Sequence, residues 1–257
     1  RITKKLPTKH QKITKNHQQK PRIAKMPNPR KLDSKTETKP KQFLELHGKP
    51  ILIYTLELFQ QAPSIDGIVL VMLESWIPYS EELIDRFRIT KMKSVVEGGK
   101  TGQESIFRGI AKVHELFSED SVVLIHDGVR PLVDVQTIET CIETVRSKGS
   151  AITVSPATET VTLVGEEGQV GKILPRKDCQ MAKAPQCFWL RDIYAAHKKA
   201  QEENRLDFID SASLMQFYGK ELYTVEGPVE NIKITTPGDF YIFRAIEDAR
   251  ENSQIFG

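Results

Sequence analysis

The pattern of hydrophobic and polar positions changes near Pro40. Residues 1–39 show no apolar periodicity, whereas the chain from Pro40 onward alternates short apolar runs with segments of helical spacing. Continuous apolar runs are typical of buried strands, and apolar residues three and four apart indicate helices. We therefore expect two parts: a poorly ordered arm over residues 1–39 and a folded domain over residues 40–257.

Helix and strand signals alternate along the folded part. The helical spacing predicts helices over 49–62, 80–87, 104–117, 135–149, 190–204, 211–218 and 237–252. The apolar runs predict strands over 67–73, 94–99, 121–131, 150–157 and 221–227. Residues 160–175 alternate around a Gly/Glu turn and predict a projecting β-hairpin arm, which spans about 156–178 with its flanks. This order predicts an α/β fold with a mostly parallel sheet and helices on both faces.

The helix predicted over 135–149 has a well-defined inward face. Its apolar positions Ile138, Cys141, Ile142 and Val145 share one side of the helix. Gly149 follows directly, where a helix commonly ends on glycine. We expect this helix to cover one face of the sheet.

The net charge of +3 conceals an uneven distribution. Residues 1–40 hold 13 Lys/Arg and 2 Asp/Glu, which leaves 24 basic and 32 acidic residues in the remainder. A basic arm attracts the phosphates of nucleic acids in a salt-dependent way. The arm contains no aromatic residue for stacking on bases and no recognisable binding motif. A solvated arm is therefore the favoured interpretation, and nucleic acid is not an expected partner.

The sequence excludes several other classes of protein. No window reaches the length of apolar sequence that spans a membrane, and the N-terminus lacks the apolar region of a secretory signal. The three cysteines are Cys141, Cys179 and Cys187, an odd number without zinc-site spacing. This usage favours a reducing, cytoplasmic location without a disulfide framework.

Polar, glycine-containing sequences follow the predicted strands, where ligands bind in α/β folds. In "EGGKTGQES" (97–105), glycines allow close approach of a ligand, and Ser105 lies in the first turn of a helix, which favours anions. A flexible turn without a ligand is the alternative. In "IHDGVRP" (125–131), Asp127 is placed to hold Mg²⁺ against a phosphate, or else to cap the turn. We expect Arg130 to pair with an acidic group and His126 to be a packed residue.

Lysines mark two further positions. "NIKITTP" (231–237) predicts a short strand with Lys233 and Thr235 on one side, so that Lys233 either reaches a phosphate or protects a sheet edge. Lys41 stands at the entry to an apolar segment, a common position for a phosphate-binding lysine. Such a lysine usually follows a glycine-rich loop, yet residues 1–47 contain no glycine.

The order of these motifs is more specific than any one of them. "PKQFLELHGKPIL" (40–52), "GGKTGQESI" (98–106), "HDGVRP" (126–131), "PATETV" (156–161), "APQCF" (184–188), "DSAS" (210–213) and "ENIKITTPGD" (230–239) occur in sequence. Over residues 40–250 the chain resembles the cytidylyltransferases that act on 2-C-methyl-D-erythritol 4-phosphate or on ribitol 5-phosphate.

The resemblance implies a Rossmann-like nucleotidyltransferase fold, a homodimer that exchanges β-arms, and a requirement for Mg²⁺. The implied reaction joins CTP to a polyol phosphate, which gives a CDP-polyol and pyrophosphate. The ribitol branch would serve teichoic acid or capsule synthesis, and the methylerythritol branch would serve isoprenoid synthesis.

The resemblance also implies roles for individual residues. Lys41 would stabilise the α-phosphate, Lys233 would position the attacking phosphate, and Asp127 would lie beside the metal and the ribose. Thr160 and Arg176 would hold the polyol phosphate from the partner subunit's arm. The residues implied for nucleotide binding, besides Asp127, are Gly98, Gly99, Lys100, Thr101, Gly102, Gln103, Ser105 and Gly128.

Three departures from the family pattern separate the hypotheses. Gly102 stands where the methylerythritol enzymes commonly carry arginine, which favours ribitol 5-phosphate as the substrate, and Ala184 replaces a usual threonine. In place of the family's first strand and glycine-rich loop stands "MPNPRKLDSKTET" (26–38). That departure motivates a second hypothesis, a catalytically defective member of the family. The first hypothesis is an active cytidylyltransferase, and the third is a module whose basic arm binds nucleic acid.

Overall fold

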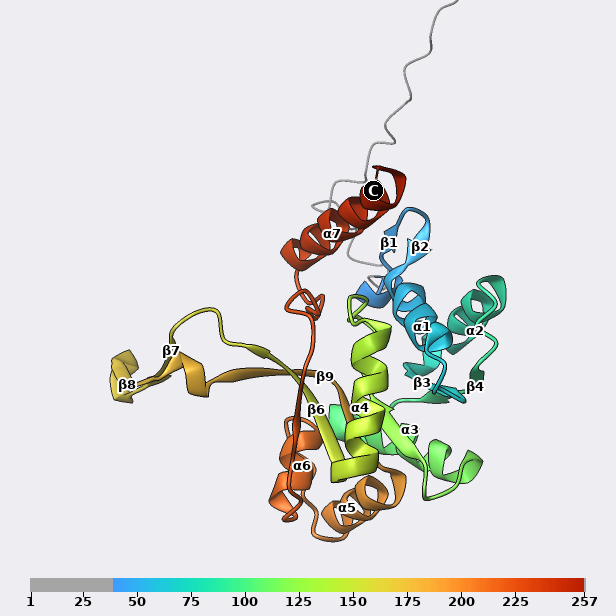
Figure 1. The fold of residues 1–257 in the computed structure, drawn as a ribbon. Coiled ribbons are helices and arrows are strands. Elements are labelled where there is room, and N and C mark those ends of the chain that lie inside the picture. Colours follow the sequence, from blue (N-terminus) through green and yellow to red (C-terminus); the bar gives the residue numbers. More distant parts are fainter. Residues whose placement is uncertain (1–38, 257) are drawn as a thin grey trace, which may run out of the picture. The chain divides into compact units, whose positions relative to one another are not determined.

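The computed structural model describes the backbone of residues 39–256 and the side chains of residues 39–252. The predicted arm, residues 1–39, lies outside the described residues except for Lys39. The helices in Figure 1 are α1 (Ile51–Gln61), α2 (Ile77–Arg86), α3 (Gly102–Leu116), α4 (Val135–Lys148), α5 (Leu190–Glu202), α6 (Ser211–Phe217) and α7 (Pro237–Phe256). The 3-10 turns are η1 (Lys41–Phe43), η2 (Glu74–Trp76), η3 (Glu166–Gly168) and η4 (Arg176–Asp178). The strands are β1 (Glu45–Leu46), β2 (Lys49–Pro50), β3 (Ile68–Met72), β4 (Met92–Glu97), β5 (Val122–Ile125), β6 (Ser150–Pro156), β7 (Val161–Val164), β8 (Val170–Leu174), β9 (Gln180–Trp189) and β10 (Thr224–Glu226).

The predicted helices are all present, with ends that differ by a few residues. Helix α4 shows why its sequence is helical. The side chain of Asp134 accepts a hydrogen bond from Thr137 N, and Gly149 ends the helix with a φ of 92°, in the left-handed region. The inward positions predicted for this helix are confirmed, since Ile138 and Val145 are fully buried.

The central sheet has four strands in the order β10-β6-β9-β5. Strands β10 and β6 are parallel, whereas β9 runs antiparallel to both of its neighbours. The α/β class is confirmed, but the sequence pattern gave no indication of β9. The reason is Pro185, which argues against a central strand and is tolerated here because the register shifts between Ile152 and Val154. A second, two-stranded parallel sheet pairs β3 with β4.

Helices cover both faces of the four-stranded sheet. Alternate residues of β9 mark the two sides: Phe188 packs in the cluster that contains α5 and α6, and Cys187 packs against α4. A separate cluster joins α1 and α2 to β3. Within the described part of the chain, no helix is long and apolar enough to cross a membrane.

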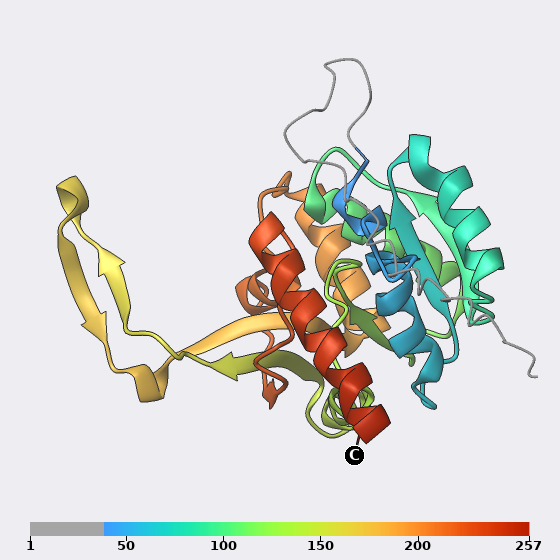
Figure 2. The same cartoon turned by 90° about the horizontal axis from the view of Figure 1, so that it is seen from above.

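The predicted β-hairpin arm is confirmed. Strands β7 and β8 pair antiparallel, with Val161 opposite Leu174, and they project away from the helix-covered sheet (Figures 1 and 2). Four apolar side chains on the arm are more than half exposed, namely Leu163, Val164, Val170 and Ile173. The proposed role of the arm in dimer formation stays a prediction.

Candidate active site

Asp127 lies just after β5 and faces two cations. Lys233 Nζ lies 2.8 Å from Asp127 Oδ1, and Arg130 Nε lies 2.8 Å from Oδ2. Arg130 also donates to the backbone carbonyl of Asn231 over 2.9 Å. The structure thus brings together Asp127 and Lys233, which the sequence placed at separate loops, and the expected pairing of Arg130 with an acidic group is confirmed.

The charges in this cluster are set by burial and pairing. Burial would raise the pKa of Asp127, but the hydrogen bonds from Lys233 and Arg130 outweigh it and hold that pKa below its usual range. Asp127 is therefore ionised at neutral pH, and the three side chains carry one net positive charge. The side chain of Lys233 is 45% exposed, so its ammonium group is accessible to an anion from solvent.

The segment that carries Lys233 forms no strand and joins no sheet of the described chain, so the predicted short strand at 231–237 is wrong. Ile234 N donates instead to the carbonyl of Val129, in a loop, over 3.0 Å. The predicted alternation is confirmed, because Lys233 and Thr235 are exposed whereas Ile234 is buried. A lysine that faces solvent beside Asp127 is consistent with contact to a phosphate.

Asp239 fixes the end of this segment. Its Oδ2 accepts hydrogen bonds from the backbone N–H groups of Thr235 (2.8 Å) and Thr236 (2.7 Å), and these bonds lower the pKa of Asp239 to about 2. Thr236 Oγ1 in turn accepts from Asp239 N over 3.3 Å, which completes a capping box at the start of α7. The sequence analysis missed Asp239, although the Thr-x-x-Asp spacing is a recognisable signal for such a box.

The loop between β4 and α3 is held by its own side chains. Thr101 caps α3 by accepting from Glu104 N over 3.1 Å, and Gly99 N donates to Ser105 Oγ over 3.0 Å. A Cβ at Gly98 would lie 3.1 Å from Ser105 Oγ, so a larger residue there would press on the loop. Ser105 is thus fixed in the first turn of the helix, as predicted.

Arg108 was not identified from the sequence, yet it braces this loop. Its Nη1 donates to the carbonyl of Gly98 over 3.0 Å, and its Nη2 donates to Glu104 Oε1 over the same distance. Glu104 and Arg108 stand four residues apart on α3, a spacing that commonly pairs opposite charges on a helix. That spacing was the available signal.

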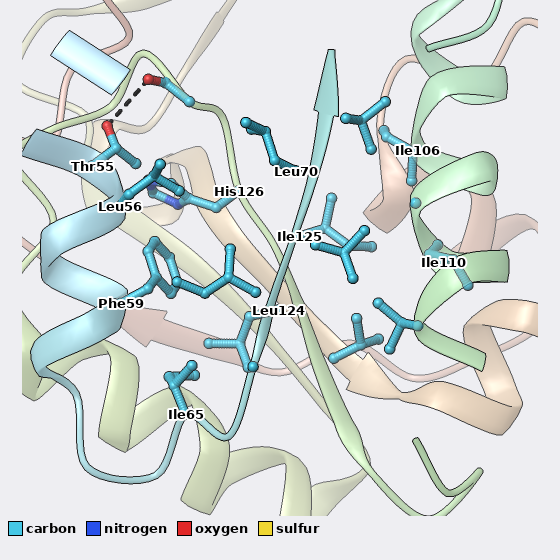
Figure 3. A pocket seen from close by; sticks show the side chains of 18 of the residues that line it. Thr55, Leu56, Phe59, Ile65, Leu70, Ile106, Ile110, Leu124, Ile125 and His126 are labelled. Atoms are coloured by element: carbon cyan, nitrogen blue, oxygen red, sulfur yellow. Dashed lines mark hydrogen bonds between the residues drawn. The ribbon is translucent and has the colours of Figure 1, made fainter. Parts of the chain in front are cut away.

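Several predicted residues line one cavity of about 750 Å³. Its lining includes Lys41, Gly98, Ser105 and Gly128, which come from η1, the β4–α3 loop, the first turn of α3 and the β5–α4 loop. Lys41 is exposed and lines a cavity whose other lining residues are largely apolar (Figure 3). The carboxyl-end loops of β4 and β5 therefore converge as expected for an α/β fold.

Other predicted residues lie elsewhere. Lys100, Thr101 and Gln103 line a second cavity, of about 410 Å³. The Gln103 side chain is buried and donates to the carbonyl of Arg205 over 2.9 Å, so it has a structural function. Gly102 begins α3 and is exposed. This chain places only part of the predicted nucleotide loop beside Lys41.

The two predicted arm residues are also apart from the Asp127 cluster. Thr160 and Arg176 are exposed, and Arg176 donates to the carbonyl of Thr158 over 3.2 Å. Both flank the β7–β8 hairpin, which projects away from the sheet (Figure 2). Their predicted role requires a partner subunit.

Asn231 and Lys183 are further residues that the sequence analysis did not single out. Buried Asn231 Nδ2 donates to the carbonyl of Ala184 in β9 over 2.7 Å. Lys183, also in β9, donates to the carbonyl of Val229 over 2.7 Å. These bonds tie the segment that carries Lys233 to the strand that leads into the arm.

The donor set at Asp127 bears on the expected magnesium ion. Among the described residues, no group of three or more His, Cys, Asp or Glu side chains is placed to hold a metal. Mg²⁺ in nucleotide sites is usually bound by one or two carboxylates together with substrate phosphates. A single ionised carboxylate fits that kind of site, because each oxygen of Asp127 keeps a second lone pair beside its bond to a cation.

The arrangement suits chemistry on phosphates. Lys233 and Arg130 beside Asp127, and Lys41 at the cavity, are cations that can neutralise phosphate groups, and phosphoryl transfer depends mainly on alignment and on such charge stabilisation. Burial lowers the pKa of His126 to about 4, so its imidazole is neutral at pH 7. Its expected role as a packed residue is supported by a ring contact of 5.0 Å with Phe59.

Comparison with known proteins agrees with this chemistry. A model of the IspD family, described as 2-C-methyl-D-erythritol 4-phosphate cytidylyltransferase, matches residues 33–248. A Streptococcus agalactiae protein named ribitol-5-phosphate cytidylyltransferase is 50% identical over 222 residues, which cover 86% of this chain and 92% of the relative. A Geotalea uraniireducens protein named 2-C-methyl-D-erythritol 4-phosphate cytidylyltransferase is 40% identical over 206 residues, with coverage of 80% and 87%.

Solved structures show the same fold. The crystal structure of 4-diphosphocytidyl-2C-methyl-D-erythritol synthase from Anaerococcus prevotii aligns with a TM-score of 0.71 and 26% identity. The alignment covers 79% of this chain and 88% of that structure.

Proposed function

Because the chain belongs to the IspD family of cytidylyltransferases, we propose that it transfers the cytidylyl group of CTP to D-ribitol 5-phosphate. The observation that carries this choice is the 50% identity to a relative named for ribitol 5-phosphate, against 40% to one named for 2-C-methyl-D-erythritol 4-phosphate. Gly102, where the methylerythritol enzymes commonly have arginine, points to the same branch. The products are a CDP-polyol and pyrophosphate.

In the proposed reaction, a phosphate oxygen of the polyol phosphate attacks the α-phosphorus of CTP. A new P–O bond forms, and the bond from the α-phosphorus to the oxygen that bridges to the β-phosphate breaks. The nucleophile is already largely ionised near neutral pH, so alignment matters more than a general base. Lys233 orients the attacking phosphate, and Lys41 neutralises charge on the α-phosphate.

Asp127 has two functions in this proposal. Through its bond of 2.8 Å it holds the Lys233 ammonium in one place. It would also be the protein ligand of Mg²⁺, which when bound neutralises charge on the nucleotide phosphates. Gly98 and Ser105, the residues of the predicted nucleotide loop that line the cavity beside Lys41, would contribute polar groups for the cytidine.

We further propose that the enzyme is a homodimer whose β7–β8 arms reach the partner's site. The exposed apolar side chains of the arm support this, since such side chains are usually covered by an interface. Thr160 and Arg176 would then hold the polyol phosphate of the other subunit. CTP, a polyol phosphate and a second copy of the chain are the proposed partners, in the cytoplasm.

The decisive experiment measures pyrophosphate release from CTP and Mg²⁺ with D-ribitol 5-phosphate or 2-C-methyl-D-erythritol 4-phosphate. We expect turnover with both CTP and ribitol 5-phosphate present and a much lower kcat/KM with the methylerythritol compound. The reverse preference would assign the chain to the other branch. Failure with both would refute a cytidylyltransferase activity for this chain.

A second candidate function is nucleotide binding without turnover. It is favoured by the sequence before Lys41, because residues 1–47 contain no glycine to form a phosphate loop. CTP that raises the Tm without any release of pyrophosphate would support this candidate. If CTP at millimolar concentration leaves the Tm unchanged, the chain is defective in binding as well.

A further inference from the structure

Lys183 is the fourth residue of β9, the strand that leads from the arm into the central sheet. Its Nζ donates to the carbonyl of Val229 over 2.7 Å and to the carbonyl of Pro228 over 3.4 Å. Both carbonyls belong to the loop between β10 and Lys233. The lysine is partly buried, so part of the hydration of its amino group is lost on folding.

The charge of Lys183 is not neutralised by a carboxylate. Within the described part of the chain, its amino group bonds only to these two carbonyls and forms no ion pair. Burial is the main cause that lowers the pKa of Lys183, and the charge of Arg130 lowers it further. The Glu230 carboxylate acts in the opposite direction, but its effect is the smallest of the three. Two neutral carbonyl groups thus hold Lys183 close to a like charge.

The same short segment, residues 228–231, binds both Lys183 and Arg130. Lys183 bonds to the carbonyls of its first two residues, and Arg130 Nη1 donates to the carbonyl of Asn231 over 2.9 Å. The chain continues from this segment into Lys233, two residues later. Three cations therefore converge around the segment, and only one carboxylate of the described residues forms an ion pair with any of them.

The charge of these groups suits a phosphate monoester. Asp127 with its two cations carries one net positive charge, and protonated Lys183 raises this to two. A phosphate monoester carries about −1.5 to −2 charges at pH 7, because its second pKa is near 6. Such an anion at Lys183 would offset the cost of burying its ammonium group and the repulsion from Arg130.

We propose that Lys183 binds the phosphate group of the polyol phosphate beside Lys233, and so contributes to the affinity for that substrate. The inference rests on the proposed function and adds a residue to its substrate site. An ammonium group has three N–H donors, and the carbonyls of Val229 and Pro228 take two of them, which leaves one for a phosphate oxygen. Lys183 lines neither of the two cavities described above, so we expect no contact with the nucleotide.

Three substitutions of Lys183 separate its charge from its bonds to the loop. Lys183→Met removes the charge and the donors, Lys183→Gln can still donate to a carbonyl, and Lys183→Arg keeps the charge. We expect the Met and Gln variants to raise the KM for D-ribitol 5-phosphate at least about tenfold, with kcat and the KM for CTP changed by less than about twofold. Lys183→Arg should restore most of the affinity. Lys198→Met, on the exposed surface of α5, is the matched control and should behave like the parent enzyme.

A residue that only holds the loop would give a different result. Lys183→Gln would then behave like the parent enzyme, or Lys183→Met would lower kcat by displacing Lys233, and either result would overturn the inference. The Tm of each variant measures folding. If Lys183→Met does not fold, the comparison of Lys183→Gln with Lys183→Arg decides the question.

Direct binding distinguishes this inference from the proposed function. Calorimetry with Mg²⁺ and a CTP analogue that cannot transfer its cytidylyl group measures the Kd of D-ribitol 5-phosphate and of D-ribitol. We expect Lys183→Gln to bind D-ribitol 5-phosphate at least about tenfold more weakly than the parent chain does. Equal binding by the two proteins, no binding by the parent chain, or an equal loss of affinity for D-ribitol would overturn the inference. A parent chain that binds D-ribitol 5-phosphate through Lys183 but releases no pyrophosphate would refute only the proposed function.

Discussion

At the scale of single residues, Asp127 is notable because its carboxylate pairs with two cations. One oxygen faces Lys233 and the other faces Arg130, so loss of its charge affects both cations. The sequence analysis identified Asp127 and Lys233 as separate candidates at strand ends. It could not show that they touch, because 105 residues lie between them and the approach depends on long-range bonds from Ile234 N to Val129 O and from Arg130 to Asn231 O.

We expect Asp127→Asn to lower kcat for pyrophosphate release by about 100-fold, because a preorganised charge beside the transferring phosphate is lost. The measurement is kcat and KM for CTP and ribitol 5-phosphate, with the Tm as a check on folding. Asp120→Asn is the control, since Asp120 is 81% exposed at the other end of β5. A fully active Asp127→Asn enzyme would remove this residue from the proposed mechanism.

Two buried histidines predict an acid-sensitive stability. Burial lowers the pKa of His126 and of His197 to about 4. The unfolded chain therefore binds more protons than the folded chain between about pH 6.5 and pH 4, and stability falls as the pH falls through this window. Each histidine contributes a loss on the order of 2 kcal/mol between pH 7 and pH 5.

Urea unfolding at pH 7 and pH 5 measures this loss. We expect His126→Gln and His197→Gln each to reduce the difference between the two pH values by about 2 kcal/mol, since glutamine does not titrate. The two variants serve as controls for each other. If neither substitution changes the pH dependence, the histidines are not the groups that titrate.

At the scale of elements, the polar loops depend on capping interactions. Helices α4 and α7 begin with side chains that accept backbone hydrogen bonds, and α3 begins at Thr101 in the same way. Such signals are local, so the helices were predictable from sequence. Strand β9 was not predictable, because a proline such as Pro185 normally argues against a central strand. The shifted register of its pairing with β6 accommodates that residue.

Thr101→Ala should destabilise the protein by about 1 kcal/mol, because Glu104 N loses its capping acceptor. We also expect a higher KM for CTP, since Thr101 begins the helix that holds Ser105. Chemical denaturation and steady-state kinetics provide the two measurements. Thr101→Ser keeps the acceptor and should behave like the parent protein; similar losses in both variants would show that the cap is not responsible.

At the scale of the whole molecule, the proposed dimer makes each active site a product of two chains. Arg176 would act on the partner's site, whereas Lys233 would act on its own. Nothing in the sequence of one chain specifies this assembly, since the arm's side chains show only that an apolar surface is exposed. The resemblance to the family supplied the expectation.

Mixing two inactive variants tests the shared site. Arg176→Ala and Lys233→Ala should each be nearly inactive. After subunit exchange at equal amounts, activity should return to about one quarter of the parent value, because half of the dimers are mixed and each mixed dimer has one intact site. The control mixture replaces Arg176→Ala with Lys177→Ala, a substitution of the neighbouring residue, and combines it with Lys233→Ala in the same way. No recovery would place Arg176 in the site of its own chain or outside any site.

Strand β9 connects the arm to the segment that carries Lys233, through Ala184 and Asn231. A shift of this strand would therefore displace Lys233, the lysine proposed to bind phosphate. Thermodynamic reciprocity then applies: if docking of the arm on a second subunit improves the affinity for polyol phosphate, polyol phosphate strengthens self-association by the same factor. Sedimentation equilibrium with and without ribitol 5-phosphate would measure that factor, and Asn231→Ala should reduce it. In the proposed dimer, the bond from Asn231 to Ala184 would thus provide a means of cooperativity between the two sites.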